Sequence, residues 1–202
     1  MNHLAHFFLA WDDPDLLVGG LLGDYIKGRL KGEYGAAIEA GIKLHRSIDA
    51  FTDKHEVTRL SQSHFDPKFR RVSGIMTDII YDHFLARNWH TYHDMGLQKF
   101  SDCTFNILLE RKEHLTEPAL KTCERMYASN TLTKYYDEGF IDRSLKYLST
   151  RLSRANPLSE GFEQFLNNKE ALDADFRVFF PELIKFVDQW KSINVPKYIT
   201  ES

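Results

Sequence analysis

Residues 35–54 read GAAIEAGIKLHRSIDAFTDK. Small and apolar residues recur in this stretch at intervals of four and three, at Ala37, Gly41, Leu44, Ile48 and Phe51. This interval places them on one face of an α-helix, because about 3.6 residues complete each turn. The stretch therefore predicts a long helix that packs one face into a core.

The same spacing recurs along most of the chain, whereas alternation of apolar and polar residues is rare. We therefore predict an all-α protein, a compact single-domain helical bundle over residues 1–192, followed by a flexible tail at 193–202. Turn dipeptides such as Asp13-Pro14 and Asp66-Pro67 mark the breaks between helices. The predicted helices are 2–10, 14–29, 35–54, 56–64, 68–93, 97–115, 117–136, 138–153 and 159–192, the last with a break near Pro181.

Composition excludes several classes of protein. The 202 residues are 43% hydrophobic and 27% charged, which is typical of a globular chain and unlike collagen or low-complexity sequence. Lys and Arg number 26 against 29 Asp and Glu, and the net charge of −3 excludes a globally basic nucleic-acid binder. No apolar run reaches the roughly 18 residues of a membrane span. We therefore expect neither nucleic acid nor a membrane as partner. Two cysteines without a C-x-x-C motif are typical of a reducing compartment, so we also expect a cytoplasmic protein.

Polar residues lie in or beside the apolar rows of three predicted helices. In helix 35–54, His45 and Asp49 are one turn apart next to the apolar face, so both side chains project from the same side. The two residues form either a pair at the edge of the core, with Asp49 neutralised by Arg46 or Arg59, or part of a functional site.

The predicted helix 68–93 has Asp82 in the middle of an otherwise apolar row. A buried carboxylate without compensation is strongly destabilising, so Asp82 requires a cation. Asp78 lies one turn earlier and His83 follows directly, and two carboxylates about 6 Å apart repel unless positive charge lies between them. The cation is either an Arg or Lys from another helix or a divalent metal ion.

The segment 19–28, GGLLGDYIKG, contains three glycines before Asp24. Each costs a helix about 1 kcal/mol relative to Ala, which indicates close approach of another backbone or of a ligand. Its spacing matches neither G-x-G-x-x-G nor the Walker motif, so no nucleotide-phosphate loop is predicted. His3 and His6 place two more imidazoles on one face of helix 2–10, as a structural pair or as ligands.

Together these carboxylates and imidazoles indicate a metal site. Mn²⁺ and Mg²⁺ prefer carboxylate oxygens, and Mn²⁺ and Fe²⁺ also accept imidazole, so the mixed set favours Mn²⁺, with Mg²⁺ or Fe²⁺ as alternatives. Such an ion polarises a phosphoryl oxygen and activates water, which is the chemistry of a hydrolase. The sequence lacks the E-x-x-H repeats of di-iron bundles and the H-E-x-x-H motif of common zinc peptidases.

Several motifs resemble those of the acyl carrier protein phosphodiesterase family, also called acyl carrier protein hydrolyases. They are NHLAHFFLA at 2–10, GLLGDYIKG at 20–28, HRSIDAFTD at 45–53, DIIYDHFLARNW at 78–89 and RLSR at 151–154. The motifs occur in order over nearly the whole chain. The family is distantly similar to the HD-domain phosphohydrolases, although this chain has D-H at Asp82-His83 where those enzymes have H-D.

The resemblance implies an HD-like fold and a manganese-dependent enzyme that hydrolyses 4'-phosphopantetheine from holo-acyl carrier protein, leaving the apo form. The ligand set it implies is Asp24, His45, Asp49, Asp78 and Asp82, with His3, His6 and His83 as supporting or additional ligands. Arg46 either binds phosphate oxygens or forms a salt bridge to Asp49 or Asp53. The implied catalytic residues are Asp24 and His45 together with Asp53 or His83. Asp53 or His83 would orient the water or protonate the serine oxygen.

The implied partner predicts the charge of the enzyme surface. Acyl carrier proteins are acidic, so a basic surface is expected near the metal. Two basic clusters flank the predicted ligands in the sequence: Lys27 and Arg29 after Asp24, and Lys68, Arg70 and Arg71 before Asp78. They either dock the carrier protein or are solvated helix ends.

Two other functions remain open from the sequence. One is a metal phosphohydrolase that acts on nucleotides or other small phosphate esters. The other is a non-catalytic helical protein that binds acyl carrier protein and uses the polar clusters only as salt bridges.

Overall fold

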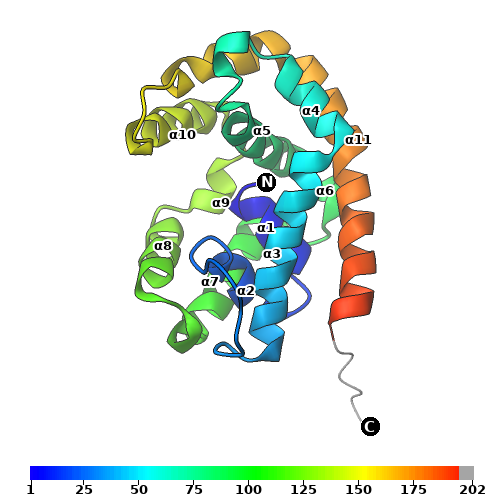
Figure 1. The fold of residues 1–202 in the computed structure, drawn as a ribbon, viewed down its shortest axis with the longest axis vertical. Coiled ribbons are helices and arrows are strands. Elements are labelled where there is room, and N and C mark those ends of the chain that lie inside the picture. Colours follow the sequence, from blue (N-terminus) through cyan, green and yellow to red (C-terminus); the bar gives the residue numbers. More distant parts are fainter. Residues whose placement is uncertain (196–202) are drawn as a thin grey trace.

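The computed structural model describes residues 1–195. Within them the chain forms eleven α-helices and three short 3₁₀ helices and no β-strand, which confirms the all-α prediction (Figure 1). The α-helices are α1 (His3–Ala10), α2 (Pro14–Leu22), α3 (Ala36–Lys54), α4 (Glu56–Ser63), α5 (Ser73–Arg87), α6 (Trp89–Tyr92), α7 (Leu97–Glu110), α8 (Glu117–Ala128), α9 (Thr131–Lys134), α10 (Glu138–Arg151) and α11 (Gly161–Asn194). The 3₁₀ helices are η1 (Pro67–Phe69), η2 (Lys112–His114) and η3 (Leu158–Glu160).

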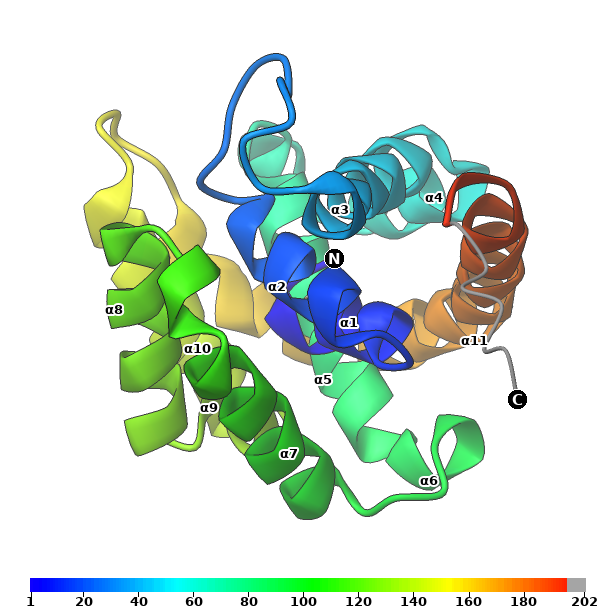
Figure 2. The same ribbon diagram turned by 90° about the horizontal axis from the view of Figure 1, so that it is seen from below.

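Helices α1 and α5 lie in the middle of the molecule, surrounded by the others (Figure 2). Eleven of the fifteen residues of α5 are buried, which explains why its sequence is apolar on more than one face. Helices α2, α3 and α4 lie on one side, α11 on a second and α7 to α10 on a third (Figures 1 and 2). Their apolar faces share one hydrophobic core. None of the described helices is long and apolar enough to cross a membrane.

The turn dipeptide Asp13-Pro14 lies at the start of α2, as predicted. The Asp13 side chain accepts hydrogen bonds from the backbone N–H groups of Asp15 and Leu16 at the start of α2, and Pro14 occupies its first turn. The Asn2 side chain likewise accepts from the N–H of His3 at the start of α1. The entry of the chain into both helices is therefore defined by local side chains.

Helix α2 ends at Leu22, so the prediction of helix up to residue 29 is wrong. Gly28, Gly32 and Gly35 have φ angles of 78°, 88° and 78°, a left-handed conformation that interrupts a helix. The Arg46 guanidinium donates hydrogen bonds to the carbonyl oxygens of Ile26 at 2.7 Å and Gly28 at 2.8 Å. Arg46 thereby fastens the loop 23–35 to α3.

Other predicted boundaries also differ from the structure. The predicted helix 68–93 begins only at Ser73 and is followed by the separate short helix α6, and 117–136 is divided at Asn130, which has a φ of 51°. Helix α11 runs through Pro181 without a break, because the fully buried Phe179, Phe180 and Leu183 anchor it on both sides. It continues to Asn194, and residues 196–202 of the predicted tail lie outside the described residues.

Helices α2 and α3 approach each other through glycines. A Cβ atom on Gly19 would lie 2.3 Å from the carbonyl oxygen of Ile38, and one on Gly41 would lie 2.7 Å from that of Leu16. No side chain fits at either position, so the two backbones are in direct contact. This is the close backbone approach that the glycines near Asp24 predicted.

The contact can be tested with two neighbouring glycines. Gly19→Ala forces the helices apart and should lower the free energy of unfolding by about 1–3 kcal/mol, the usual cost of overpacking. Gly20→Ala is the control, since its Cβ would meet only the Ala10 side chain, at 4.0 Å. It should leave stability unchanged or raise it by up to about 1 kcal/mol. Urea unfolding measures both, and equal stability of the two variants would contradict the contact.

Candidate functional site

An acidic pocket of about 270 Å³ opens where α1, α3, α5 and the start of the loop 23–35 meet. It is lined by Met1, Asn2, His3, His6, Asp24, His45, Asp49, Asp53 and Asp78. These residues come from separate parts of the chain, so the fold brings most of the sequence-predicted site residues together. We call this site the acidic pocket.

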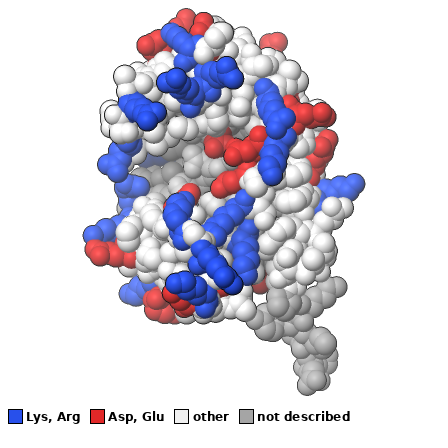
Figure 3. Space-filling model, in the orientation of Figure 1, with Lys and Arg blue, Asp and Glu red and all other residues white. Residues whose placement is uncertain are grey.

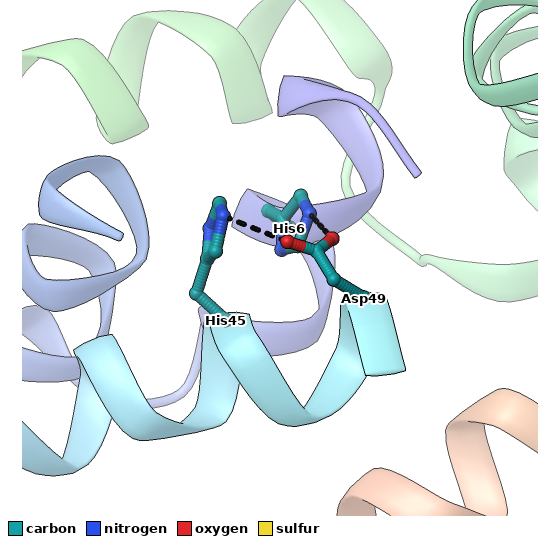
Figure 4. Close-up of side chains that lie close together, drawn as sticks. All are labelled: His6, His45 and Asp49. Carbon is teal, nitrogen blue, oxygen red and sulfur yellow. Dashed lines mark hydrogen bonds and ion pairs between the residues drawn. The ribbon is translucent and has the colours of Figure 1, made fainter. Parts of the chain in front are cut away.

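Three of these residues form its closest cluster (Figure 4). One ligand atom each from His6, His45 and Asp49 lies within 4.8 Å of the other two. The Nε2 atom of His6 lies 3.1 Å from one oxygen of Asp49, and the Nε2 atom of His45 lies 3.2 Å from the other. The two imidazole rings are stacked with centroids 3.9 Å apart.

Asp24 and His3 extend the cluster. An Asp24 oxygen lies 3.6 Å from His45 Nε2, and the other oxygen lies 3.7 Å from His3 Nδ1. Neighbouring ligands of a six-coordinate divalent ion are about 3 Å apart when the bonds are near 2.1 Å. The Nδ1 atoms of His6 and His45 are buried without a hydrogen-bond partner among the described residues, so both rings interact through Nε2. The donor set therefore fits a divalent cation.

Burial sets the protonation of the cluster. Desolvation, together with the adjacent His45, lowers the pKa of His6 to about 4. Burial alone would raise the pKa of Asp49, but its contacts with His45 and His6 outweigh burial and lower that pKa well below its usual range. At neutral pH His6 is uncharged and Asp49 is ionised, which are the forms that bind metal ions.

The N-terminal ammonium group of Met1 also lies in the acidic pocket, 2.6 Å from an oxygen of Asp78. Burial alone would lower the pKa of this ammonium group, but the Asp78 carboxylate outweighs burial and raises it. Four carboxylates line the pocket, and the ammonium group offsets only one of them. Because like charges at this range repel, the remaining acidic residues favour a bound cation.

Asp82 lies outside the acidic pocket lining and has a different role from the predicted metal ligand. Its two oxygens accept hydrogen bonds from the backbone N–H groups of Asn2 at 3.1 Å and Leu4 at 2.8 Å, in the first turn of α1. Burial raises its pKa to about 7. Its buried oxygens are satisfied by the unpaired N–H donors at the start of α1, and the nearby Met1 ammonium group also favours its ionised form.

His83 and Arg46 also lie away from the acidic pocket. The Nδ1 atom of His83 lies 2.7 Å from the carbonyl oxygen of Tyr135, and the residue lines a separate cavity beside Arg87 and Lys169. The Arg46 guanidinium donates hydrogen bonds to the carbonyl oxygens of Ile26 and Gly28. It therefore forms neither of the predicted contacts, with phosphate or with Asp49 or Asp53. Asp53, in contrast, lines the acidic pocket as predicted.

With this geometry established, comparison with other proteins gives the family. The sequence profile described as "Acyl carrier protein phosphodiesterase" matches residues 1–183. The chain belongs to the acyl carrier protein phosphodiesterase family. The family resemblance that the motifs predicted is thereby confirmed.

Curated relatives agree with this assignment. Proteins named acyl carrier protein phosphodiesterase from Serratia proteamaculans and Photorhabdus laumondii are each 32% identical, over 187 and 189 residues. Each alignment spans 92% of this chain, and 96% and 94% of the relatives. The Escherichia coli protein of the same name is 28% identical over 186 residues, or 92% of this chain and 96% of the relative. No solved structure matches, so the HD-domain likeness stays a prediction.

In this member of the phosphodiesterase family, the two predicted docking clusters lie in different places. Lys27 and Arg29 are exposed in the loop that begins beside Asp24. Lys68 forms an ion pair of 2.6 Å with Glu160 at the surface. The remaining two residues of that cluster, Arg70 and Arg71, line a shallow cavity with residues 155–157.

His6 has a more central place in the site than predicted, and the Met1 ammonium group is a member that was not predicted. His6 is one of the three closest residues, although it was expected only as a supporting ligand. Its position three residues after His3, on one helix face, was the available indication. The Met1 ammonium group has no sequence pattern of its own, because only the fold shows that α1 starts inside the acidic pocket.

The separate role of Asp82 predicts a difference in stability without metal. In EDTA at pH 6, Asp82→Ala should lower the free energy of unfolding by about 2 kcal/mol or more, because two buried N–H groups lose their acceptor. Asp24→Ala, whose side chain is 46% exposed, should change it by no more than about 0.5 kcal/mol. Urea unfolding measures both, and similar losses would contradict the assigned role of Asp82.

Proposed function

We propose that this chain is a metal-dependent phosphodiesterase that hydrolyses 4'-phosphopantetheine from holo-acyl carrier protein. Water adds to phosphorus, the bond from phosphorus to the serine oxygen breaks, and the serine oxygen takes up a proton. The observation that carries this proposal is the cluster of His6, His45 and Asp49 within 4.8 Å, in a chain of this family.

Mn²⁺ is the cation we propose, with Mg²⁺ or Fe²⁺ as alternatives, since the cluster combines imidazole nitrogen with carboxylate oxygen. A divalent ion supplies charge that polarises phosphoryl oxygens and lowers the pKa of water. His6, His45 and Asp49 would bind it, and Asp24 lies close enough to His45 to complete the set. Asp78 is a less favoured ligand than these four residues, because its carboxylate is paired with the Met1 ammonium group.

The remaining residues of the pocket have separate roles in the proposal. Asp53 has no hydrogen-bond or ion-pair partner among the described residues and lines the acidic pocket, so it is available to orient the water. Arg46 holds the loop 23–35 through the carbonyl oxygens of Ile26 and Gly28, so the proposal gives it no phosphate contact. Asp82 positions α1 and takes no part in the chemistry.

The proposed substrate also accounts for the expected partners. An acyl carrier protein is a small acidic protein, so recognition depends on exposed basic residues and requires neither nucleic acid nor a membrane. We propose a cytoplasmic location because Cys103 and Cys123 are both free, as is typical of a reducing compartment.

The activity test follows the mass of the carrier protein. Holo-acyl carrier protein incubated with the enzyme and Mn²⁺ should lose the mass of its prosthetic group, and EDTA should abolish the loss. His45→Ala and Asp49→Ala should lower kcat/KM by at least about 100-fold, since both remove a proposed ligand. His90→Ala is the control, because His90 is exposed on α6. Release that is insensitive to EDTA, or full activity of either ligand variant, would refute the metal mechanism. Cleavage of small phosphate esters alone would favour the other phosphohydrolase function.

The docking residues predict an effect on KM. Lys27→Glu with Arg29→Glu should raise KM for holo-acyl carrier protein by about 3–10-fold at low salt, because both residues are exposed beside Asp24. Reversal of Lys68, Arg70 and Arg71 should have a smaller effect, since Lys68 is already paired with Glu160. Lys185→Glu, on the exposed face of α11, is the control. Steady-state kinetics at two salt concentrations measure the effect, and a KM unchanged by the loop variants would exclude docking there.

A further inference from the structure

A second cavity adjoins the acidic pocket and has a different chemical character. This side groove, of about 500 Å³, lies among α5, α8, α9 and α10. Asn2 and His3 line both the side groove and the acidic pocket, so the two cavities meet at the first residues of α1. Figure 3 shows a hollow bordered by Lys and Arg side chains, with acidic side chains gathered beside it.

The floor of the side groove is apolar. Ile79 of α5 and Met126 of α8 are almost fully buried beneath it, and Phe140 and Leu148 of α10 are partly buried along it. Hydroxyl groups interrupt this floor at Thr131 and Ser144, and the Asn2 amide lies at the junction with the acidic pocket. A volume of about 500 Å³ falls within the range of small-molecule sites, about 300–1,000 Å³.

Three basic side chains border the side groove. Arg143 is neutralised by Asp137 at 2.7 Å and lies over the Phe140 ring, so it forms part of the wall. Arg125 and Lys134 are exposed and have no carboxylate partner among the described residues. The rim therefore carries free positive charge while the floor is neutral.

From this arrangement we infer that the side groove binds the pantetheine arm of the carrier protein while the phosphodiester lies in the acidic pocket. The inference rests on the proposed function. The arm is an uncharged chain with a dimethyl group, methylenes, two amides and a terminal thiol. Its apolar groups match the floor, and its amides match the hydroxyls of Thr131 and Ser144 and the amide of Asn2.

The direction of the arm follows from the position of the two cavities. A phosphodiester has two substituents, here the serine of the carrier protein and the arm. The side groove is large enough for a flexible chain but too small for a folded domain. The arm thus enters the side groove, and the carrier protein stays outside, where Arg125, Lys134 and the loop 23–35 present positive charge to its acidic surface.

Filling the side groove tests the inference. Ser144→Phe on α10 places a ring where the arm would lie, and Thr131→Phe does so from α9, so that one variant remains if the other does not fold. Thr150→Phe, on the exposed side of α10, is the matched control. Circular dichroism establishes that each variant is folded.

Two inhibitors of the hydrolysis provide the measurement. Free 4'-phosphopantetheine reaches both cavities, whereas inorganic phosphate reaches only the acidic pocket. In the wild type, 4'-phosphopantetheine should inhibit at least about tenfold more strongly than phosphate, since a well-filled groove adds binding free energy. Ser144→Phe and Thr131→Phe should remove this advantage and leave inhibition by phosphate unchanged, while Thr150→Phe should retain it.

The outcomes separate the inference from the function on which it rests. If the wild type releases phosphopantetheine but the groove-filling variants keep the full inhibitor preference, the inference is overturned and the proposed function stands. Equal weakening of both inhibitors also overturns it, because the damage is then general. If the wild type releases no phosphopantetheine at all, the proposed function and the inference fail together.

Discussion

The direct contact between the backbones of α2 and α3 determines the geometry of the site. Gly19 and Gly41 leave no room for a Cβ atom between the helices, and a Cβ on Gly23 would lie 2.2 Å from the His45 ring. The end of α2 leads into Asp24, while α3 carries His45 and Asp49 on successive turns. A single methyl group in this contact would move the Asp24 carboxylate away from the His45 imidazole. The close approach that these glycines allow therefore offsets the helix stability that they cost.

The second constraint is the start of α1 beside α5. Asp82 is fully buried and accepts two N–H groups that α1 cannot satisfy within itself. Asp78, one turn earlier on α5, pairs with the Met1 ammonium group. These two carboxylates hold the first turn of α1 in place, and His6 projects from that turn towards Asp49. A buried carboxylate that would otherwise be destabilising thus gives a short helix a defined position and orientation.

Much of this was predictable from spacing, and the exceptions have physical causes. Periodicity predicts helix wherever one face is buried, so it gives α1 and α3 nearly to the residue. It fails at the end of α2, where the helix stops at Leu22 and Gly28 adopts a left-handed conformation within the loop that follows, because the conformation of this loop depends on the fold. Spacing places Asp24, His45 and Asp49 on suitable faces, but it cannot say what faces each polar group. The sequence therefore predicts that Asp82 needs a partner, and only the fold shows that this partner is the start of α1, with its backbone N–H groups and the nearby Met1 ammonium group.

The net charge of the chain is close to zero, but acidic, neutral and basic side chains are concentrated in different regions of the surface. Carboxylates line the acidic pocket, uncharged side chains form the floor of the adjoining groove, and Arg125 and Lys134, unpaired among the described residues, border that groove. In the proposed reaction the scissile group is a charged diester joined to a neutral arm on one side and an acidic protein on the other. A surface of one sign could not suit all three, because the carboxylates that attract a cation would repel the carrier protein. Because the acidic pocket and the side groove meet at Asn2 and His3, a single substrate can contact each region with the part that complements it.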